Sequence, residues 1–419
     1  MAGLLRNTIR RALSSPAWKR TSRWIRGIPD YTHLEAQYEK ESIDAEVIAY
    51  FGDARAKTYQ LIQWLPVLEE LAKHHRVAIV LRRPSAIAAV SEHTNLPIVY
   101  QRRFLDFMNM LFRSHCRLAI YVNNGMTNFQ ALGYAPMVHV HVNHGESDKI
   151  SMVSNQAKAY DRVFVAGQAA VERHRRALLD FDESKLMRIG RPQLDIPAPN
   201  VLPRTVLTTV MYAPTWEGEN DANNYTSVDA YGPQIVRAVL GLGGVRLVYK
   251  PHPRVENSAD PVIAKANAEI LALIEAAGGE HCVQMQGNIL GMFEAVDLMI
   301  TDVSSVGLDF LYMRPEKPLL LTDRRNDPET LHTEAPITRA TPVLSEANAD
   351  DISGLITTML HEDQEAGTRA KMRTHYFGAG AVGSSLEAFV GAVTTLLRER
   401  EDELRGHTET RDSGAVEAG

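Results

Sequence analysis

The segment from Leu298 to Asp323 constrains the fold of this chain most, because strand, loop, helix and strand follow one another within it. The runs 298–301 and 319–321 are short and apolar, which is typical of buried parallel strands. Between them, apolar residues recur every third or fourth position from Val306 to Met313, which predicts a helix. Two such strands joined by a helix form a βαβ unit, the building block of open parallel sheets.

The loop inside this segment places two hydroxyl groups, those of Ser304 and Ser305, at the N-terminus of the predicted helix. Free backbone N–H groups and the positive end of the helix dipole suit a phosphate group at such a position. The alternative is an ordinary helix capped by a serine hydroxyl. This loop alone does not separate the two interpretations.

Strands and helices alternate along most of the chain, which predicts an α/β fold with doubly wound parallel sheets. The Pro-rich segment after Ile189–Asp195 indicates a domain boundary, and the alternation restarts beyond it. We expect two Rossmann-like domains, residues 41–195 and 200–400, with a ligand cleft between them. The predicted ends are a basic amphipathic arm over residues 1–40 and a flexible tail over residues 401–419. The expected strands cover residues 45–51, 77–81, 118–122, 137–142, 163–166, 206–213, 245–250, 281–285, 298–301 and 319–321, and the expected helices cover 59–71, 104–112, 172–179, 232–242, 261–277, 351–361 and 384–400.

Composition excludes several classes of protein. The hydrophobic fraction is 45%, the charged fraction is 23% and the net charge is −6, so no nucleic-acid partner is expected. The two cysteines, Cys116 and Cys282, cannot build a disulfide framework, and no zinc-ligand spacing occurs, so no metal site is expected. No apolar run approaches the roughly 20 residues needed to span a bilayer.

The first 26 residues carry seven Lys or Arg side chains, and no acidic residue precedes Asp30. Apolar residues lie on one helical face of this arm, and Trp18 and Trp24 follow. Such a segment can lie on an anionic membrane surface. A solvated basic arm and a cleaved organellar presequence have similar chemistry and remain alternatives.

Polar clusters stand where four predicted strands end. Because the carboxyl ends of parallel strands meet at one edge of a sheet, we expect these clusters to line one site. Each cluster alone is a weak signal, since a histidine after a strand is usually a hydrogen-bonded loop residue. The candidate residues are His144, Gly145 and Lys149; Thr215; Lys250, His252 and Arg254; and Asp302, Ser304 and Ser305.

These residue types favour phosphoryl or glycosyl transfer from a nucleotide donor. His252, Arg254 and the two serines could neutralise and orient a diphosphate. Another histidine could take the proton from an attacking hydroxyl group. No Walker A sequence is present, which disfavours a P-loop kinase. The GxGxxG sequence at residues 378–383 follows no expected strand, which disfavours a simple NAD dehydrogenase.

The same clusters carry a resemblance to a known family. NHGESDK, GRPQLD, YAPTW, YKPHP and TDVSSVGLDF resemble, in order and spacing, the HGxxxK, GxPRxD, APTW, KPHP and TDYSSxxFD motifs of the CDP-glycerol glycerophosphotransferases. These enzymes build teichoic acid in cell-wall biogenesis. The resemblance covers roughly residues 130–325 of this chain.

The resemblance implies a GT-B fold, an enzyme, and transfer of glycerol phosphate or a related polyol or sugar phosphate from a CDP-linked donor. The acceptor would be a hydroxyl group on a cell-envelope glycan or lipid-linked intermediate, and no tightly bound cofactor is expected. The protein would be cytoplasmic and peripheral at the inner face of the cell membrane. The resemblance also assigns roles: His144 and His252 are catalytic, Gly145 and Lys149 lie on the acceptor side, and Thr215, Lys250, Arg254, Asp302, Ser304, Ser305 and Asp309 bind the donor.

The chain departs from the family pattern at three motif positions and near its C-terminus. Asn143 stands where the family has Trp, Gln193 where it has Arg, and Val303 where it has Tyr. The segment 378–385 lacks the acid and the arginine of a DGxxxxR-like sequence. Two alternatives therefore remain, a GT-B glycosyltransferase that uses a nucleotide sugar and a catalytically inactive module that binds a glycan or a partner. The acceptor, primase or polymerase activity, and the oligomeric state stay open.

Overall fold

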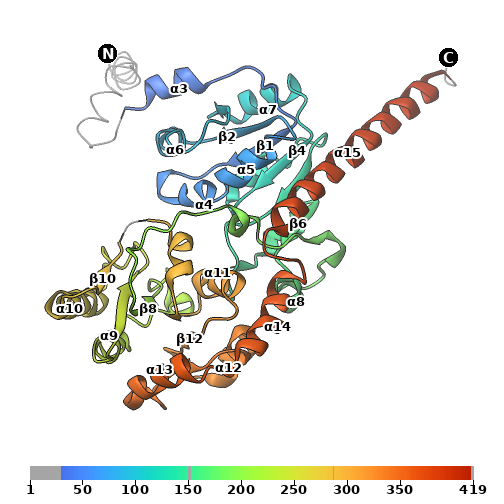
Figure 1. Cartoon of the computed structure of the whole chain (residues 1–419). Helices are drawn as coiled ribbons and strands as arrows, with labels where there is room; N and C mark the ends of the chain where they lie inside the picture. Colours follow the sequence, from blue (N-terminus) through green and yellow to red (C-terminus); the bar gives the residue numbers. More distant parts are fainter. Residues whose placement is uncertain (1–29, 150–151, 286, 417–419) are drawn as a thin grey trace, which may run out of the picture. The chain divides into compact units, whose positions relative to one another are not determined.

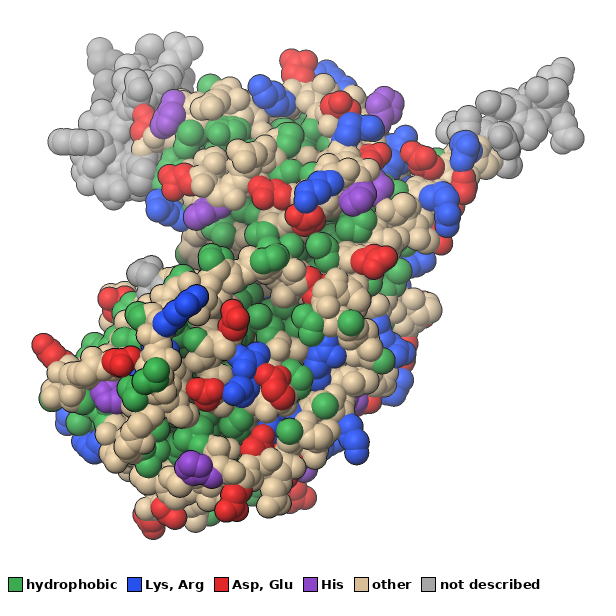
Figure 2. All heavy atoms as spheres, in the orientation of Figure 1, with side chains coloured by type: hydrophobic (Ala, Val, Ile, Leu, Met, Phe, Trp, Pro, Cys, Tyr) green, Lys and Arg blue, Asp and Glu red, His purple; other side chains and the backbone are tan. Residues whose placement is uncertain are grey.

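The computed structural model of the chain describes residues 30–149, 152–285 and 287–416 (Figure 1). Residues 1–29 of the predicted basic arm, which was expected over residues 1–40, lie outside the described residues. On the face shown in Figure 2, acidic and basic side chains are interspersed, in keeping with the modest net charge of −6.

Two parallel sheets of seven and six strands form the framework, in the orders β3-β2-β1-β4-β5-β6-β7 and β10-β9-β8-β11-β12-β13. Every residue of the central strands β1, β2 and β9 is buried, which explains their unbroken apolar sequences. The strands are β1 (Val47–Phe51), β2 (Val77–Leu81), β3 (Ile98–Tyr100), β4 (Leu118–Tyr121), β5 (Val138–His141), β6 (Arg162–Val165), β7 (Leu186–Arg188), β8 (Thr208–Ala213), β9 (Val245–Tyr249), β10 (Cys282–Val283), β11 (Leu298–Thr301), β12 (Leu319–Thr322) and β13 (Val343–Leu344).

Helices follow most strands, and their ends use the expected capping chemistry. At the start of α10, Asp260 accepts a hydrogen bond from the Val262 N–H, and Gly278 ends the helix with a φ of 60°. The helices are α3 (Thr32–Tyr38), α4 (Tyr59–Ile62), α5 (Leu65–Leu71), α6 (Pro84–Val90), α7 (Phe104–Phe112), α8 (Gln168–Ala177), α9 (Gly232–Leu240), α10 (Pro261–Ala277), α11 (Ser305–Met313), α12 (Pro328–Glu334), α13 (Ile352–His361), α14 (Ala366–Phe377) and α15 (Ser384–Val416).

The chain divides into two compact units, residues 1–137 and 138–419. In the second unit the six-stranded sheet has an apolar core on each face. Met299 of β11 belongs to the core that includes residues of α11, whereas Leu298 and Ile300 belong to the core that includes residues of α9, α10 and α13. The change from the first sheet to the second falls between β7 and β8, and the predicted domain limits stay a prediction.

The structure differs from the sequence-based expectations at several single elements. The helix expected over residues 59–71 is two helices, because Pro66 has no N–H to continue the first and stands in the first turn of the second. Strands β3, β7 and β13 were missed, since runs of two or three residues give no periodic signal.

The last helix is longer than expected. α15 continues to Val416, beyond residue 400, where the sequence analysis ended the helix and began a flexible tail. Arg400 contacts Glu403 at 3.3 Å, and Arg405 pairs with Asp402, so ion pairs one turn apart support the extension.

Candidate active site

The predicted site residues follow strands of the second unit at their carboxyl ends. Residues 143–149 follow β5, Thr215 follows β8, residues 250–254 follow β9, and residues 302–305 follow β11 into α11. Contacts within this unit connect these loops to one another, as described below.

His144 is held by the residue before it. The Asn143 Oδ1 accepts the backbone N–H of His144 at 2.8 Å and lies 3.1 Å from its Nδ1. Burial, and to a lesser extent the nearby positive charge of Arg191, lowers the pKa of His144 to about 4. The imidazole is therefore neutral near pH 7, the form in which it can accept a proton.

The acidic residues of the same loop support its structure. Arg173 of α8 donates to Glu146 at 2.6 Å and to Asp148 at 2.9 Å, and all three side chains are buried. The Tyr376 hydroxyl donates to the second oxygen of Asp148, and burial raises the pKa of Asp148. These contacts hold the His144 loop against α8 and α14. Glu146 and Asp148 are therefore already paired with side chains of the protein.

Lys149 connects the His144 loop to the loop after β8. Its Nζ donates to the Thr215 Oγ1 at 3.2 Å, and the Thr215 N–H donates to the Asp302 Oδ2 at 2.7 Å. Burial lowers the pKa of Lys149, whereas the negative charge of Asp302 raises it. Residues predicted on the acceptor side and on the donor side thus lie in direct contact.

Asp302 organises the loops around it. It is fully buried and also accepts the Thr322 hydroxyl at 2.7 Å. Burial raises its pKa to about 6, and hydrogen bonds from Ser227, Thr322 and Thr215 act in the opposite direction. Because both carboxylate oxygens are used inside the protein, Asp302 positions the Thr215 loop and is poorly placed to contact a donor directly.

The N-terminus of α11 carries the two serines. Ser304 is the N-cap residue, but its side chain makes no capping hydrogen bond. Its buried Oγ has no hydrogen-bond partner in the structure, which leaves the hydroxyl available to a ligand. Ser305 is the first helical residue.

Gly145 brings the His144 loop against this helix end. A Cβ built at Gly145 would lie 3.9 Å from the Ser305 Cβ and 3.4 Å from the Arg191 Nη2. The absence of a side chain at Gly145 thus keeps the space between the two loops and the guanidinium open.

Arg191 is a site residue that the sequence analysis missed. Its Nε donates to the Asp309 Oδ1 at 3.2 Å, and both side chains are buried. Burial raises the pKa of Asp309, and the Arg191 charge lowers it. Asp309 therefore orients Arg191 and has one oxygen committed to it. The sequence feature that could have identified Arg191 is its place in the GRPQLD motif. In the structure it follows Gly190, whose φ is 71°.

The Lys250–Arg254 loop adds a second neutral histidine. The His252 Nδ1 accepts the backbone N–H of Arg254 at 3.2 Å, and burial lowers the His252 pKa to about 4. The Lys250 Nζ donates to the Met285 carbonyl at 3.2 Å. One of the hydrogen bonds of this ammonium group is therefore made within the protein.

Two aromatic rings at the site make cation–π contacts with basic side chains. The Arg254 guanidinium lies 4.1 Å from the Trp216 ring centroid. The Tyr225 ring has the Lys149 Nζ at 5.6 Å and the Arg325 guanidinium at 4.1 Å. Tyr225 and Arg325 were not singled out from the sequence, because no motif letter marks them. Cations on aromatic faces have restricted positions, which suits the binding of a fixed anion.

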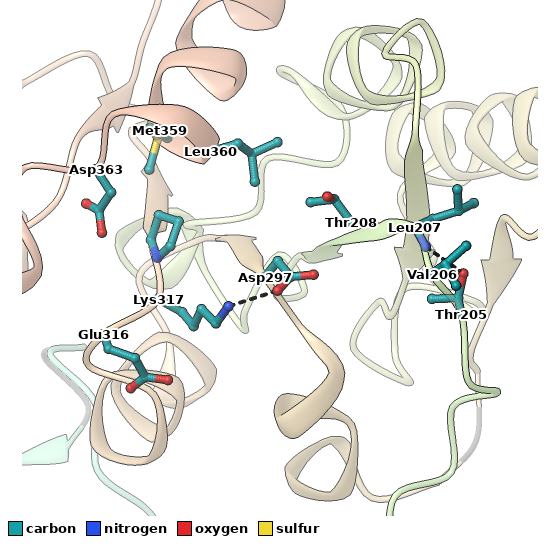
Figure 3. A pocket seen from close by; sticks show the side chains of 11 residues that line it. Thr205, Val206, Leu207, Thr208, Asp297, Glu316, Lys317, Met359, Leu360 and Asp363 are labelled. Carbon is teal, nitrogen blue, oxygen red and sulfur yellow. Dashed lines mark hydrogen bonds and ion pairs between the residues drawn. The ribbon is translucent and has the colours of Figure 1, made fainter.

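A hollow of about 540 Å³ lies elsewhere on the second unit (Figure 3). Its lining includes residues just before β8, β11 and β12, among them Leu207, Asp297 and Lys317, and Lys317 donates to Asp297 at 2.9 Å. These positions lie at the amino ends of the strands. The hollow is therefore separate from the candidate site at the carboxyl ends.

No group of three or more His, Cys, Asp or Glu residues in residues 30–149, 152–285 and 287–416 could hold a metal ion. No helix among them is long and apolar enough to cross a membrane.

The two parallel sheets define a GT-B-like α/β fold. The chain belongs to the CDP-glycerol:poly(glycerophosphate) glycerophosphotransferase family, whose sequence profile matches residues 97–324. This family implies a CDP-glycerol-type donor. No curated protein sequence matches the chain.

Solved structures resemble the fold at low sequence identity. The wall teichoic acid polymerase TagF has a TM-score of 0.55 and 14% identity, over 94% of this chain and 98% of TagF. The UDP-GlcNAc 2-epimerase from Neisseria meningitidis has a TM-score of 0.54 and 13% identity, over 83% of this chain and 99% of the epimerase. The prediction of a GT-B-like α/β fold and the predicted family are confirmed.

Proposed function

We propose that this enzyme transfers glycerol phosphate, or a related polyol or sugar phosphate, from a CDP-linked donor to a hydroxyl group. The acceptor is a cell-envelope glycan or a lipid-linked intermediate. The observation that carries the proposal is the approach of the His144 loop to the N-terminus of α11 at Gly145, inside the region that matches the family.

In this proposal the diphosphate of the donor lies at the N-terminus of α11. The unpartnered Ser304 hydroxyl, the Ser305 hydroxyl and the first backbone N–H groups of the helix are hydrogen-bond donors for it. His252 and Arg254 supply further donors from the loop after β9. A diphosphate needs several such donors at once, and the N-terminus of α11 together with the loop after β9 offers them.

His144 accepts the proton of the attacking hydroxyl group. The acceptor oxygen forms a bond to the β-phosphorus, the bond from that phosphorus to the bridging oxygen breaks, and CMP leaves with the bonding electrons. Lys149 and Arg191 stabilise the negative charge that develops on the transferred group. The low pKa of His144 keeps its base form populated over the whole neutral range.

The test is CMP release by the purified full-length chain from CDP-glycerol with a crude lipid acceptor. His144→Gln should cut turnover by roughly 10²-fold or more, the usual effect of losing an acid–base group, while donor binding survives. Turnover close to wild type in this variant would remove His144 from the mechanism. Release of a nucleoside diphosphate from a nucleotide sugar would favour the glycosyltransferase alternative. Absence of turnover with every donor would favour the inactive binding module.

We also propose that the protein contacts an anionic membrane surface, where a lipid-linked acceptor would be found. In the first unit, helix α7 presents Phe104, Leu105 and Phe112 to the surface, with 46%, 64% and 69% of each residue exposed. Arg102 and Arg103, which precede the helix, are exposed as well. Exposed apolar residues beside basic ones suit the headgroup region of an anionic bilayer.

A further inference from the structure

We infer that Asn143 is a positioning residue that holds His144 with its proton on Nδ1 and its unprotonated nitrogen at Nε2. The base role of that nitrogen rests on the proposed function. The assignment of the proton rests on the hydrogen bonds around Asn143 together with the neutral state of the buried ring.

The orientation of the Asn143 amide group is determined by two backbone groups. Its Oδ1 accepts the His144 N–H at 2.8 Å, and its Nδ2 donates to the Met152 carbonyl at 3.2 Å. Reversing the amide would place a donor against a donor and an acceptor against an acceptor. The atom that faces the His144 Nδ1 at 3.1 Å is therefore an oxygen.

An amide oxygen can only accept a hydrogen bond, so the His144 Nδ1 must carry the proton in this contact. Burial keeps the ring neutral near pH 7, and a neutral imidazole has only one N–H. The lone pair that can take a proton is consequently at Nε2.

The backbone of Asn143 supports this arrangement. Its φ is +55°, in the left-handed region, which asparagine adopts more readily than most residues. The resembling family has Trp at this position, and an indole N–H is a donor without an acceptor. The fixing of the His144 tautomer by Asn143 is therefore particular to this chain, since the family motif with Trp at that position has no acceptor there.

His252 offers a comparison within the same molecule. The Arg254 backbone N–H donates to its Nδ1 at 3.2 Å, so that nitrogen is the acceptor and the proton of the neutral ring is on Nε2. The two site histidines thus have opposite tautomers. His144 presents an acceptor at Nε2, as a base requires, and His252 presents a donor at Nε2, as an anionic oxygen requires.

The test is a long-range ¹H–¹⁵N spectrum of the full-length protein labelled with ¹⁵N-histidine near pH 7, with signals assigned by their loss in His144→Gln and His252→Gln. The wild type should show His144 protonated at Nδ1 and His252 protonated at Nε2. Protonation of His144 at Nε2 would overturn the inference, whatever the enzyme's activity.

Two substitutions then test the role of the side chain. Asn143→Gly removes the amide without strain at positive φ, and His144 should lose its preference for the Nδ1–H form while His252 keeps its own. Asn143→Asp retains an acceptor and should retain Nδ1–H, with a raised His144 pKa because of the added negative charge. An unchanged His144 tautomer in Asn143→Gly would overturn the inference.

Kinetics separate positioning from general damage to the fold. Asn143→Gly should lower kcat for CMP release by roughly 10²-fold, the size of a lost acid–base contribution, with little change in KM for the donor. Asn143→Asp should restore most of kcat and move the pH profile to higher pH. If the tautomers behave as expected but the wild type releases no CMP, the positioning role stands and the proposed function fails.

Discussion

At the scale of single residues, burial moves the pKa values of the site histidines and of Asp302 in opposite directions. His144 and His252 have pKa values lowered to about 4, whereas the pKa of Asp302 is raised to about 6. The cause is the same in each case, because burial disfavours the charged form of either group. These three residues therefore make the stability of the fold depend on pH.

The histidines should make the protein less stable as the pH falls from about 6.5 to about 4, because only the unfolded chain binds their protons in that window. Asp302 acts oppositely: its contribution is present below about pH 4 and is lost as the pH rises through about 6. The double variant His144→Gln/His252→Gln should therefore lose less free energy of unfolding than the wild type between about pH 7 and about pH 5. Denaturant titrations at the two pH values check this. An equal pH dependence in both proteins would contradict the lowered pKa values.

At the scale of elements, the N-terminus of α11 and the clamp on the His144 loop are two separable devices. The helix end presents hydrogen-bond donors, and one of them, the buried Ser304 hydroxyl, has no partner among the described residues. The clamp uses Arg173 of α8 to fix the acidic residues of the loop. The first device should affect ligand binding and the second should affect stability.

The double variant Ser304→Ala/Ser305→Ala should weaken binding of CDP-glycerol by roughly 1.5–3 kcal/mol, the range for hydrogen bonds to charged groups. The loss should be smaller for CMP, because a single phosphate reaches fewer donors. Calorimetric titration of both ligands into wild type and variant measures the difference. Equal losses for both ligands, or no loss, would place the diphosphate elsewhere.

Arg173→Leu should destabilise the second unit by about 3–5 kcal/mol, because it leaves Glu146 and Asp148 buried without their partner. The control is Arg175→Leu on the same helix, where the partner Glu183 is exposed and the ion pair contributes little. Equilibrium denaturation of both variants is the measurement. Similar midpoints for the two would show that the clamp is not needed for the fold.

At the scale of the whole molecule, the proposed membrane contact would involve two separate segments, the predicted basic arm and the exposed side chains of α7. Deleting residues 1–26 should weaken binding to acidic vesicles, at about 1 kcal/mol for each Lys or Arg near the surface. Leu105→Ser with Phe112→Ser should weaken it further, and turnover with a soluble acceptor should persist in both. Vesicle flotation with acidic and neutral lipids is the measurement. Equal binding to acidic vesicles by truncated and full-length proteins would show that residues 1–26 do not contribute to membrane binding.

Strand periodicity and motif order in the sequence determined the α/β class, the central strands of both sheets, the family and the loops that carry the site. These features follow from local rules, since a buried parallel strand must be apolar and ligand loops must follow its carboxyl end. The short strands β3, β7 and β13 gave no such local signal.

Only the tertiary structure decided what each polar residue contacts. The sequence predicted Asp302 and Asp309 as ligands of the donor, but one is enclosed by backbone and hydroxyl donors and the other pairs with Arg191, more than a hundred positions away in the chain. Arg191, Asn143 and Arg173 acquire their roles only where distant loops meet. The reason is physical: burial and hydrogen-bond partners set the charge and availability of a side chain, and both arise from contacts that local sequence does not encode.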